Sequence, residues 1–235
     1  MSTSGITELL RSRRAPTPQE LDGIPWLHKL QPRDRKVVQS ALEVGEIQVG
    51  GHVCREGRPV RHWLGLIDGL LKVSNDRRDG QTITYMGVPA GSWFGEGTAL
   101  KRECYRYDVQ ALRRSTIAAL PLEQFHWLVD NSIEFNRTIM YQLNERVAQF
   151  FVSRETDRIN NPEMRVARTL VGLFNPILAP GVGEVLRITQ QELAGIVGLS
   201  RQRVNQALTR LAGQGLIRID YGSLQVLDLA ALHAY

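Results

Sequence analysis

The pattern of hydrophobic and polar positions divides this chain into regions with different periods. Between residues 46 and 122, short runs alternate apolar and polar side chains, and turns rich in Gly, Asp and Pro separate them. A period of two is typical of strands that bury one face, and its even repetition predicts an antiparallel sandwich or jelly roll. The predicted strands cover residues 47–49, 52–54, 63–67, 70–73, 82–85, 109–112 and 116–120.

Helical spacing replaces this alternation after Pro121. Residues 121–130 predict a short helix and residues 133–160 a long one. In the long helix, a stripe at spacings of three and four favours packing against a second copy, with Phe151 beside it. The alternative is that the stripe packs on the chain's own β-domain. The stripe consists of Met140, Leu143, Val147, Phe150 and, at its polar end, Arg154.

The last third of the chain contains helix start and stop signals in close succession. Asn161 before Pro162 predicts the start of a helix. Thr189 and Glu192 then form the pattern of a capping box, and Ser200 follows as the cap of a second helix. A short helix, a turn and a second helix are the helix-turn-helix signature. Apolar runs at 216–219 and 224–227 predict a hairpin, the wing of a winged helix.

The polar face of the second helix suggests a partner. It contains no acidic residue from 200 to 212. Arg side chains read guanine, Asn and Gln read adenine, and further Arg residues bind phosphate. The alternative is an ordinary three-helix unit with a solvated polar face. The predicted contacts to double-stranded DNA are Thr189, Gln190, Ser200, Arg201, Gln202, Arg203, Asn205, Gln206 and Arg210.

Composition excludes several classes of protein. The chain has 235 residues, 43% of them hydrophobic and 23% charged, which suffices for packed cores. No apolar stretch approaches the length of a membrane span, and no secretory signal precedes the domains, so we expect a cytoplasmic protein without membrane contact. Two cysteines are too few for a disulfide framework. The net charge of +5 is a weak indication of nucleic-acid binding.

Two segments carry a resemblance to a known family. Residues 87–96 (GVPAGSWFGE) are similar to the phosphate-binding cassette, and residues 199–205 (LSRQRVN) to the start of the recognition helix, of the cyclic-AMP receptor protein and FNR family of bacterial transcription regulators. The resemblance implies an α+β fold: an antiparallel β-roll, a long dimerisation helix and a winged helix-turn-helix. It also implies a homodimer on a two-fold operator, with RNA polymerase as a further partner. We expect a flexible tail at 1–25, an effector domain at 26–130, the dimerisation helix at 131–160 and the DNA-binding domain at 161–235.

The effector is less well defined by the resemblance than the DNA end. Arg106 falls where the family's phosphate-binding Arg falls, and we expect it on a strand facing Glu96; the alternative is that it merely pairs with Glu96 or Glu103. Tyr107 replaces a small hydroxyl residue, and aromatic residues occupy the long-helix positions that meet the base. A cyclic nucleotide, another small anion and no effector at all therefore stay open. No other cofactor is implied. The predicted effector-binding residues are Gly95, Glu96, Gly97, Thr98, Arg106, Tyr107, Phe150 and Phe151.

Enzymatic and metal-dependent readings have weaker support. A cupin-like metalloenzyme would need clustered histidines, whereas no two of the five lie within three residues of each other. His52 and Cys54 on one strand face could bind haem, and Cys54 or Cys104 could act as a redox switch. No catalytic triad, phosphate-binding loop or dinucleotide fingerprint is present. We therefore predict a regulator with neither catalytic nor metal-binding residues.

Overall fold

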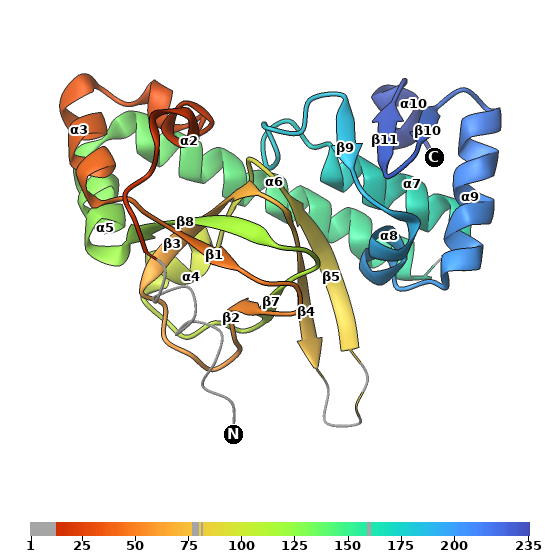
Figure 1. The fold of residues 1–235 in the computed structure, drawn as a ribbon, viewed down its shortest axis with the longest axis horizontal. Helices are drawn as coiled ribbons and strands as arrows, with labels where there is room; N and C mark the ends of the chain where they lie inside the picture. Colours follow the sequence, from red (N-terminus) through yellow and green to blue (C-terminus); the bar gives the residue numbers. More distant parts are fainter. Residues whose placement is uncertain (1–12, 77–79, 81, 159–160) are drawn as a thin grey trace.

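Two antiparallel sheets form a sandwich in the first half of the chain (Figure 1). The computed structural model describes residues 13–76, 80, 82–158 and 161–235. One sheet has the order β1 (Glu43–Ile47), β8 (Ser115–Pro121), β3 (His62–Asp68) and β6 (Trp93–Phe94). The other has the order β2 (His52–Cys54), β7 (Asp108–Ala111), β4 (Leu70–Asp76) and β5 (Thr82–Pro89). The predicted antiparallel sandwich is confirmed.

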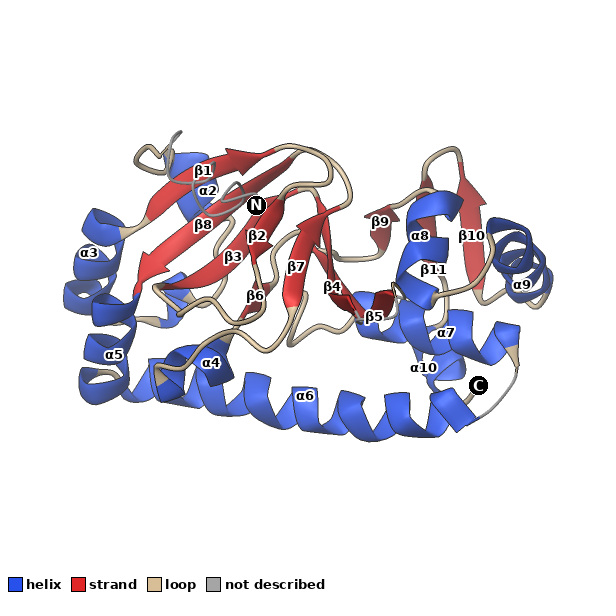
Figure 2. Ribbon diagram, turned by 90° about the horizontal axis from the view of Figure 1, so that it is seen from below, coloured by secondary structure: helices blue, strands red, loops and turns tan. Residues whose placement is uncertain are grey.

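Helices surround the sandwich and connect it to the second half. They are α2 (Pro18–Asp22), the 3-10 turn η1 (Leu27–Lys29), α3 (Pro32–Ala41), α4 (Glu96–Lys101), α5 (Leu122–Asn131) and α6 (Ile133–Arg158). Figure 2 shows α6 running beneath the sandwich and on beneath the second unit. The core between sheets and helices is aromatic: Trp63 packs against Trp26 and Trp93, with ring centroids 5.1 and 4.5 Å away. These edge and tilted contacts add to the free energy of burial.

The second unit is a bundle of helices with a small sheet. It contains α7 (Pro162–Leu173), α8 (Gln190–Val197), α9 (Arg201–Gly213) and α10 (Leu229–His233), with strands β9 (Val185–Arg187), β10 (Ile217–Asp220) and β11 (Ser223–Val226). Asn161 caps α7 as predicted, accepting hydrogen bonds from the amides of Glu163 and Met164 at 2.9 and 3.3 Å. The predicted hairpin is the pair β10–β11, and β9 adds an unpredicted third strand.

Two sequence predictions need correction in the first half. The expected strand at 47–49 is instead β1 at Glu43–Ile47, and Val49 lies in the following turn with 68% of its surface exposed. The expected flexible tail at 1–25 is wrong for residues 13–25, while residues 1–12 lie outside the described part. Arg14 forms a β-bridge with Val44, and Ile24 is 2% exposed. A buried isoleucine anchors this segment to the core.

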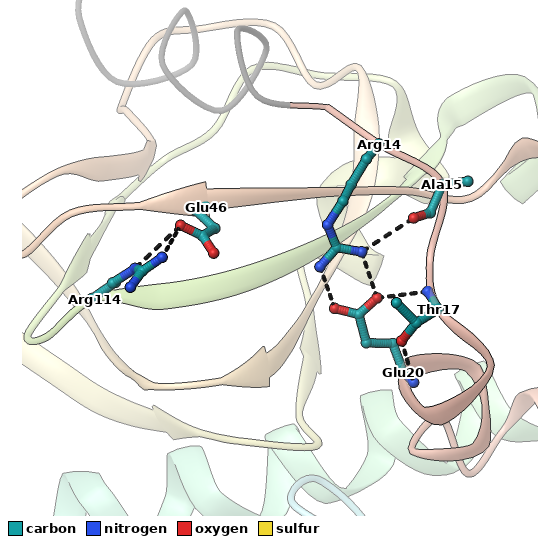
Figure 3. A network of polar contacts seen from close by, with 6 residues as sticks. All are labelled: Arg14, Ala15, Thr17, Glu20, Glu46 and Arg114. Atoms are coloured by element: carbon teal, nitrogen blue, oxygen red, sulfur yellow. Dashed lines mark hydrogen bonds and ion pairs between the residues drawn. The ribbon is translucent and has the colours of Figure 1, made fainter.

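Polar contacts fasten the same segment (Figure 3). The two guanidinium nitrogens of Arg14 donate to the Glu20 carboxylate at 2.7 and 2.6 Å, and that carboxylate also accepts from the Thr17 amide at 2.7 Å. The Arg14 guanidinium therefore lowers the pKa of Glu20 to about 2. Beside it, Arg114 of the β7–β8 turn donates to Glu46 at 2.5 Å.

The sandwich and the second unit share an apolar interface. Leu70 of β4 belongs to the hydrophobic core of the second unit, and Leu112 packs against that core. Gly87 of β5 permits the contact, because a Cβ there would lie 2.7 Å from Leu173 and 2.8 Å from Ile196. The second unit is therefore docked on the β4–β5 side of the sandwich.

An ion pair and a close backbone approach complete this interface. Arg113 forms a two-pronged ion pair with Glu192 of α8 at 2.8 and 2.6 Å and donates to the Arg187 carbonyl at 3.1 Å. Gly91, with φ +83°, approaches Gly181 so closely that a Cβ on Gly91 would lie 2.6 Å from the Cα of Gly181. Backbone meets backbone there, with no room for a side chain on either segment.

Candidate nucleic-acid interface and sensor cassette

Helices α8 and α9 form the predicted helix-turn-helix. The Thr189 hydroxyl accepts from the Glu192 amide at 3.2 Å, and the Glu192 carboxylate accepts from the Thr189 amide at 2.8 Å, so the capping box is present. Gly198 ends α8 in the left-handed region at φ +71°. Ser200 then caps α9 by accepting from the Arg203 amide at 3.4 Å. Local capping signals thus mark where both helices begin and where α8 ends.

The face of α9 opposite its core presents polar side chains to solvent. Val204, Ala207, Leu208 and Leu211 are buried, whereas Arg201, Gln202, Arg203, Asn205, Gln206 and Arg210 are exposed. Figure 1 places α9 at the end of the molecule away from the sandwich, where a long ligand could reach it unhindered. Gln190 of α8 donates to Asn205 at 2.9 Å, which links the first helix to a predicted base-reading side chain.

Arg210 lies at the edge of this face and already has a partner. It forms an ion pair with Glu163 of α7, and the Tyr235 hydroxyl donates to the same carboxylate at 2.9 Å. These two neighbours lower the pKa of Glu163. The Arg210 side chain is still 69% exposed, so it can contact a phosphate while it remains beside Glu163.

The cassette around Gly95 differs from the sequence prediction. Gly95 adopts φ +85° before α4, and Glu96 is 1% exposed. Its Oε1 forms an ion pair with Arg146 of α6, which also donates to the Trp93 carbonyl at 2.9 Å. The second oxygen, Oε2, is buried and has no hydrogen-bond partner among the described residues. A cation from the long helix thus occupies the place expected for the phosphate-binding Arg106.

Arg106 itself points elsewhere. It lies in a bend before β7 rather than on a strand, its side chain is 73% exposed, and it pairs with Glu103 at 3.0 Å. The prediction that Arg106 faces Glu96 is wrong for this conformation, because the bend turns the guanidinium to solvent. The alternative pairing with Glu103 is confirmed.

Tyr107 is turned inward at the same place. Its ring is partly buried, and burial raises the pKa of the phenol, so the phenol stays neutral at physiological pH. A Cβ on Gly95 would lie 3.9 Å from the Tyr107 oxygen. The structure therefore brings Gly95, Glu96, Gly97, Thr98 and Tyr107 together and leaves Arg106 outside.

Helix α6 continues past the sandwich, and the predicted aromatic residues lie on this later part of the helix rather than at the cassette (Figure 2). Phe150 and Phe151 are 60% and 68% exposed and contact each other, with ring centroids 6.2 Å apart. Leu143 and Arg146 face the cassette instead, and a Cβ on Gly97 would lie 3.8 Å from Leu143. The predicted stripe is thus corrected at Leu143, which packs on the sandwich core. Its apolar members Met140, Val147 and Phe150 are exposed, as is Phe151 beside them.

Sequence reasoning missed Arg146 and Arg113. A signal for Arg146 existed: it follows Phe135, Ile139 and Leu143 at spacings of four, four and three, so it shares their buried face. Nothing in the local pattern of residues 112–115 indicates the ion pair between Arg113 and Glu192, which are 79 positions apart.

The haem hypothesis, and the redox hypothesis for Cys54, do not fit the geometry. A bulge in β2 pairs His52 with Gln110 and Cys54 with Val109, two neighbours whose side chains lie on opposite faces of the sheet. Cys54 is fully buried, and burial raises the pKa of its thiol, so it is not a reactive thiolate. Cys104 is exposed. Among the residues with a described position, no group of three His, Cys, Asp or Glu side chains could hold a metal ion.

Comparisons with known proteins match both units. A family model described as "Cyclic nucleotide-binding domain" covers residues 45–132, and one described as "Crp-like helix-turn-helix domain" covers residues 164–235. No helix in the described ranges is long and apolar enough to span a membrane.

The chain is also similar to whole proteins. It is 29% identical over 179 residues to the transcriptional regulator LdrP of Thermus thermophilus, covering 75% of this chain and 88% of LdrP. It is 23% identical over 212 residues to the cyclic AMP receptor protein of the same organism, covering 90% and 96%. The structure of FixK2 from Bradyrhizobium japonicum superposes with a TM-score of 0.62 at 14% identity, covering 81% and 95%, and so shares the fold.

Proposed function

This chain belongs to the cyclic-AMP receptor protein and FNR family of transcription regulators, and we propose that it acts as a homodimer on a two-fold DNA operator. The observation that carries the proposal is the exposed polar face of α9, which has no acidic residue and three Arg side chains. One such helix reads only a few base pairs, so specificity calls for two. The uncovered apolar stripe on α6 provides a surface for the second copy.

The predicted DNA contacts divide into two roles. Arg201, Gln202, Asn205 and Gln206 would read base edges, because they lie toward the start and middle of α9. Arg203, Arg210, Thr189, Gln190 and Ser200 would contact phosphates or position the reading side chains. This is a binding function and needs no catalytic residue. We infer a cytoplasmic site of action, where bacterial DNA is located, and contact with RNA polymerase.

Selection from random duplexes tests the proposal. We expect the full-length protein to enrich an inverted repeat whose half-sites lie one DNA turn apart, about 34 Å centre to centre. Affinity for the enriched duplex should fall linearly with salt on a double-logarithmic plot, as phosphate counterions are released. Enrichment of a single unrepeated site, or of no site, would contradict the proposal.

We also propose that the sandwich controls operator affinity through a small, anionic effector. The support is the shared interface: Leu70 lies in the core of the DNA-binding unit, and Arg113 is paired with Glu192 of α8, the first helix of the helix-turn-helix. A ligand that changes the sandwich would therefore change the docking of α8, a coupling of about 1–3 kcal/mol in typical cases.

Effector-independent action is a second candidate, favoured by one observation. Arg146 already occupies the cassette and neutralises Glu96, so this carboxylate needs no ligand to balance its charge. The two candidates differ in the operator affinity of protein freed of small molecules. If the operator affinity is full without cyclic AMP or cyclic GMP and neither compound changes it, the protein acts independently of cyclic nucleotides.

A further inference from the structure

A cavity of about 370 Å³ lies apart from the cluster formed by residues 95–98 and Tyr107, where β5, α6, α7 and α8 meet. Its volume is within the range of about 300–1,000 Å³ that small-molecule sites occupy. We propose that this junction cavity is the effector site of the regulator, and that it takes a small organic anion with an apolar body. The inference rests on the proposed function and moves its effector from the cassette to the junction.

The walls of the junction cavity combine apolar side chains with polar and charged ones. Arg165 is near the start of α7, whereas Glu145 is bound to Asn175, just beyond the end of that helix, by a hydrogen bond of 2.7 Å. Ten residues of helix correspond to about 15 Å, so the two charges lie far apart. The apolar lining comprises Met86, Val152, Val171, Leu173, Ile196 and Val197.

Two lining groups lack the partner that their chemistry requires. The Gln149 amide nitrogen is buried and has no acceptor among the described residues. Arg165 donates to the Val197 carbonyl at 3.0 Å and has no carboxylate partner in the described part of the chain. Arg168, by contrast, pairs with Glu155 at 3.1 Å. A buried donor without an acceptor is costly, so a ligand with oxygen acceptors and negative charge would satisfy both groups.

The position of the cavity gives its ligand a means of control. A molecule seated there touches β5 of the sandwich, the long helix and both α7 and α8 of the DNA-binding unit. Met86, on its wall, also contacts Arg146 through its sulfur at 3.7 Å, which connects the cavity to the closed cassette. A ligand that contacts both the sandwich and the DNA-binding unit stabilises their docked arrangement relative to arrangements in which they separate.

A matched pair of glycine substitutions tests the site. Gly172 lines the cavity on α7, and a Cβ there would meet only the Gln149 nitrogen at 3.8 Å, so Gly172→Leu fills the cavity without a backbone clash. Gly195 on α8 is exposed and lies outside the lining, which makes Gly195→Leu the control. The probe is 8-anilinonaphthalene-1-sulfonate, an aromatic anion whose fluorescence rises in apolar surroundings, titrated into the full-length protein.

We expect the probe to bind the wild type and Gly195→Leu alike, and Gly172→Leu at least about tenfold more weakly. Gln149→Leu should weaken binding several-fold, and Arg106→Leu in the cassette should leave it unchanged. Equal binding by Gly172→Leu and the wild type, loss of binding in Arg106→Leu, or no saturable signal at millimolar probe would each overturn the inference.

Operator binding separates this inference from the proposed function. With saturating probe, the operator Kd of the wild type should shift by about fivefold or more, and that of Gly172→Leu should not. If Gly172→Leu abolishes probe binding but the protein has no specific DNA affinity, the cavity is a ligand site and the proposed regulatory function is wrong. If the protein binds DNA specifically but has no probe site, the regulatory function stands and the cavity inference is wrong.

Discussion

The recognition helix and the cassette each include a helix, α9 and α4, yet they present opposite surfaces. In α9 the charged side chains point to solvent and only Arg210 has a carboxylate partner among the described residues. In the cassette, Glu96 is buried and held by a cation from α6. The difference indicates that α9 is prepared for an external partner, whereas the cassette has obtained its partner from within the chain.

A charged substitution in the exposed stripe on α6 should have the largest effect. It should reduce operator binding through α9 and leave the cassette unchanged. Val147 is 54% exposed, and a carboxylate there would face its own copy across the proposed dimer seam. We expect Val147→Asp to give a monomer by light scattering and to weaken operator binding by about 10²–10⁴-fold, because one half-site is lost. Val49→Asp, at an exposed valine in the β1–β2 turn, is the control. A monomer that binds the operator with full affinity would contradict the dimer.

Substitutions in the cassette should change the free energy of unfolding rather than the DNA sequence specificity. Arg146→Ala leaves the Glu96 carboxylate buried and unpaired, which costs about 3–5 kcal/mol of unfolding free energy in comparable pairs. Adding Glu96→Gln should restore part of this loss, because a neutral amide tolerates burial better. Denaturant unfolding of the single and double variants measures both effects. A stable single variant would mean that Arg146 does not stabilise the closed cassette.

The reading face should separate base from phosphate contacts. If Arg201 donates to a guanine, Arg201→Ala should cost about 1–3 kcal/mol on the operator and relax specificity at that base. Arg210→Ala should weaken operator and random DNA alike. Fluorescence anisotropy on both duplexes measures the difference. Equal losses on both duplexes for Arg201→Ala would remove its assignment as a base reader.

The smallest effect should come from the partner of Arg210. Glu163→Gln frees the guanidinium for phosphate, so nonspecific affinity should rise by a few tenths of a kcal/mol, about the size of one exposed ion pair. Arg210 and Tyr235 lower the pKa of Glu163, so the ion pair is fully present above the ordinary glutamate pKa and is lost only as pH falls below it. Between about pH 6 and 8 the effect of Glu163→Gln should therefore be constant.

Local signals account for what could be predicted here. The caps at Asn161, Thr189 and Ser200 act within three residues, so the helix-turn-helix is legible from a short stretch of sequence. Alternation likewise reveals most strands of the sandwich. The internal partner of the cassette is not local, because Arg146 and Glu96 are 50 positions apart. They meet because the face of α6 that carries Arg146 is turned toward the cassette. The site-residue assignments on α9 remain predictions.

The contact between Gly91 and Gly181 makes the docked arrangement sensitive to a single point mutation. A Cβ on Gly181 would lie 2.9 Å from the Cα of Gly91, closer than side-chain carbons come to backbone. Alanine at this position would therefore act as a wedge between two units that each retain their own core. A single nucleotide change converts a glycine codon into an alanine codon. One point mutation, at a residue outside the reading helix, would therefore disturb the docking of the two units.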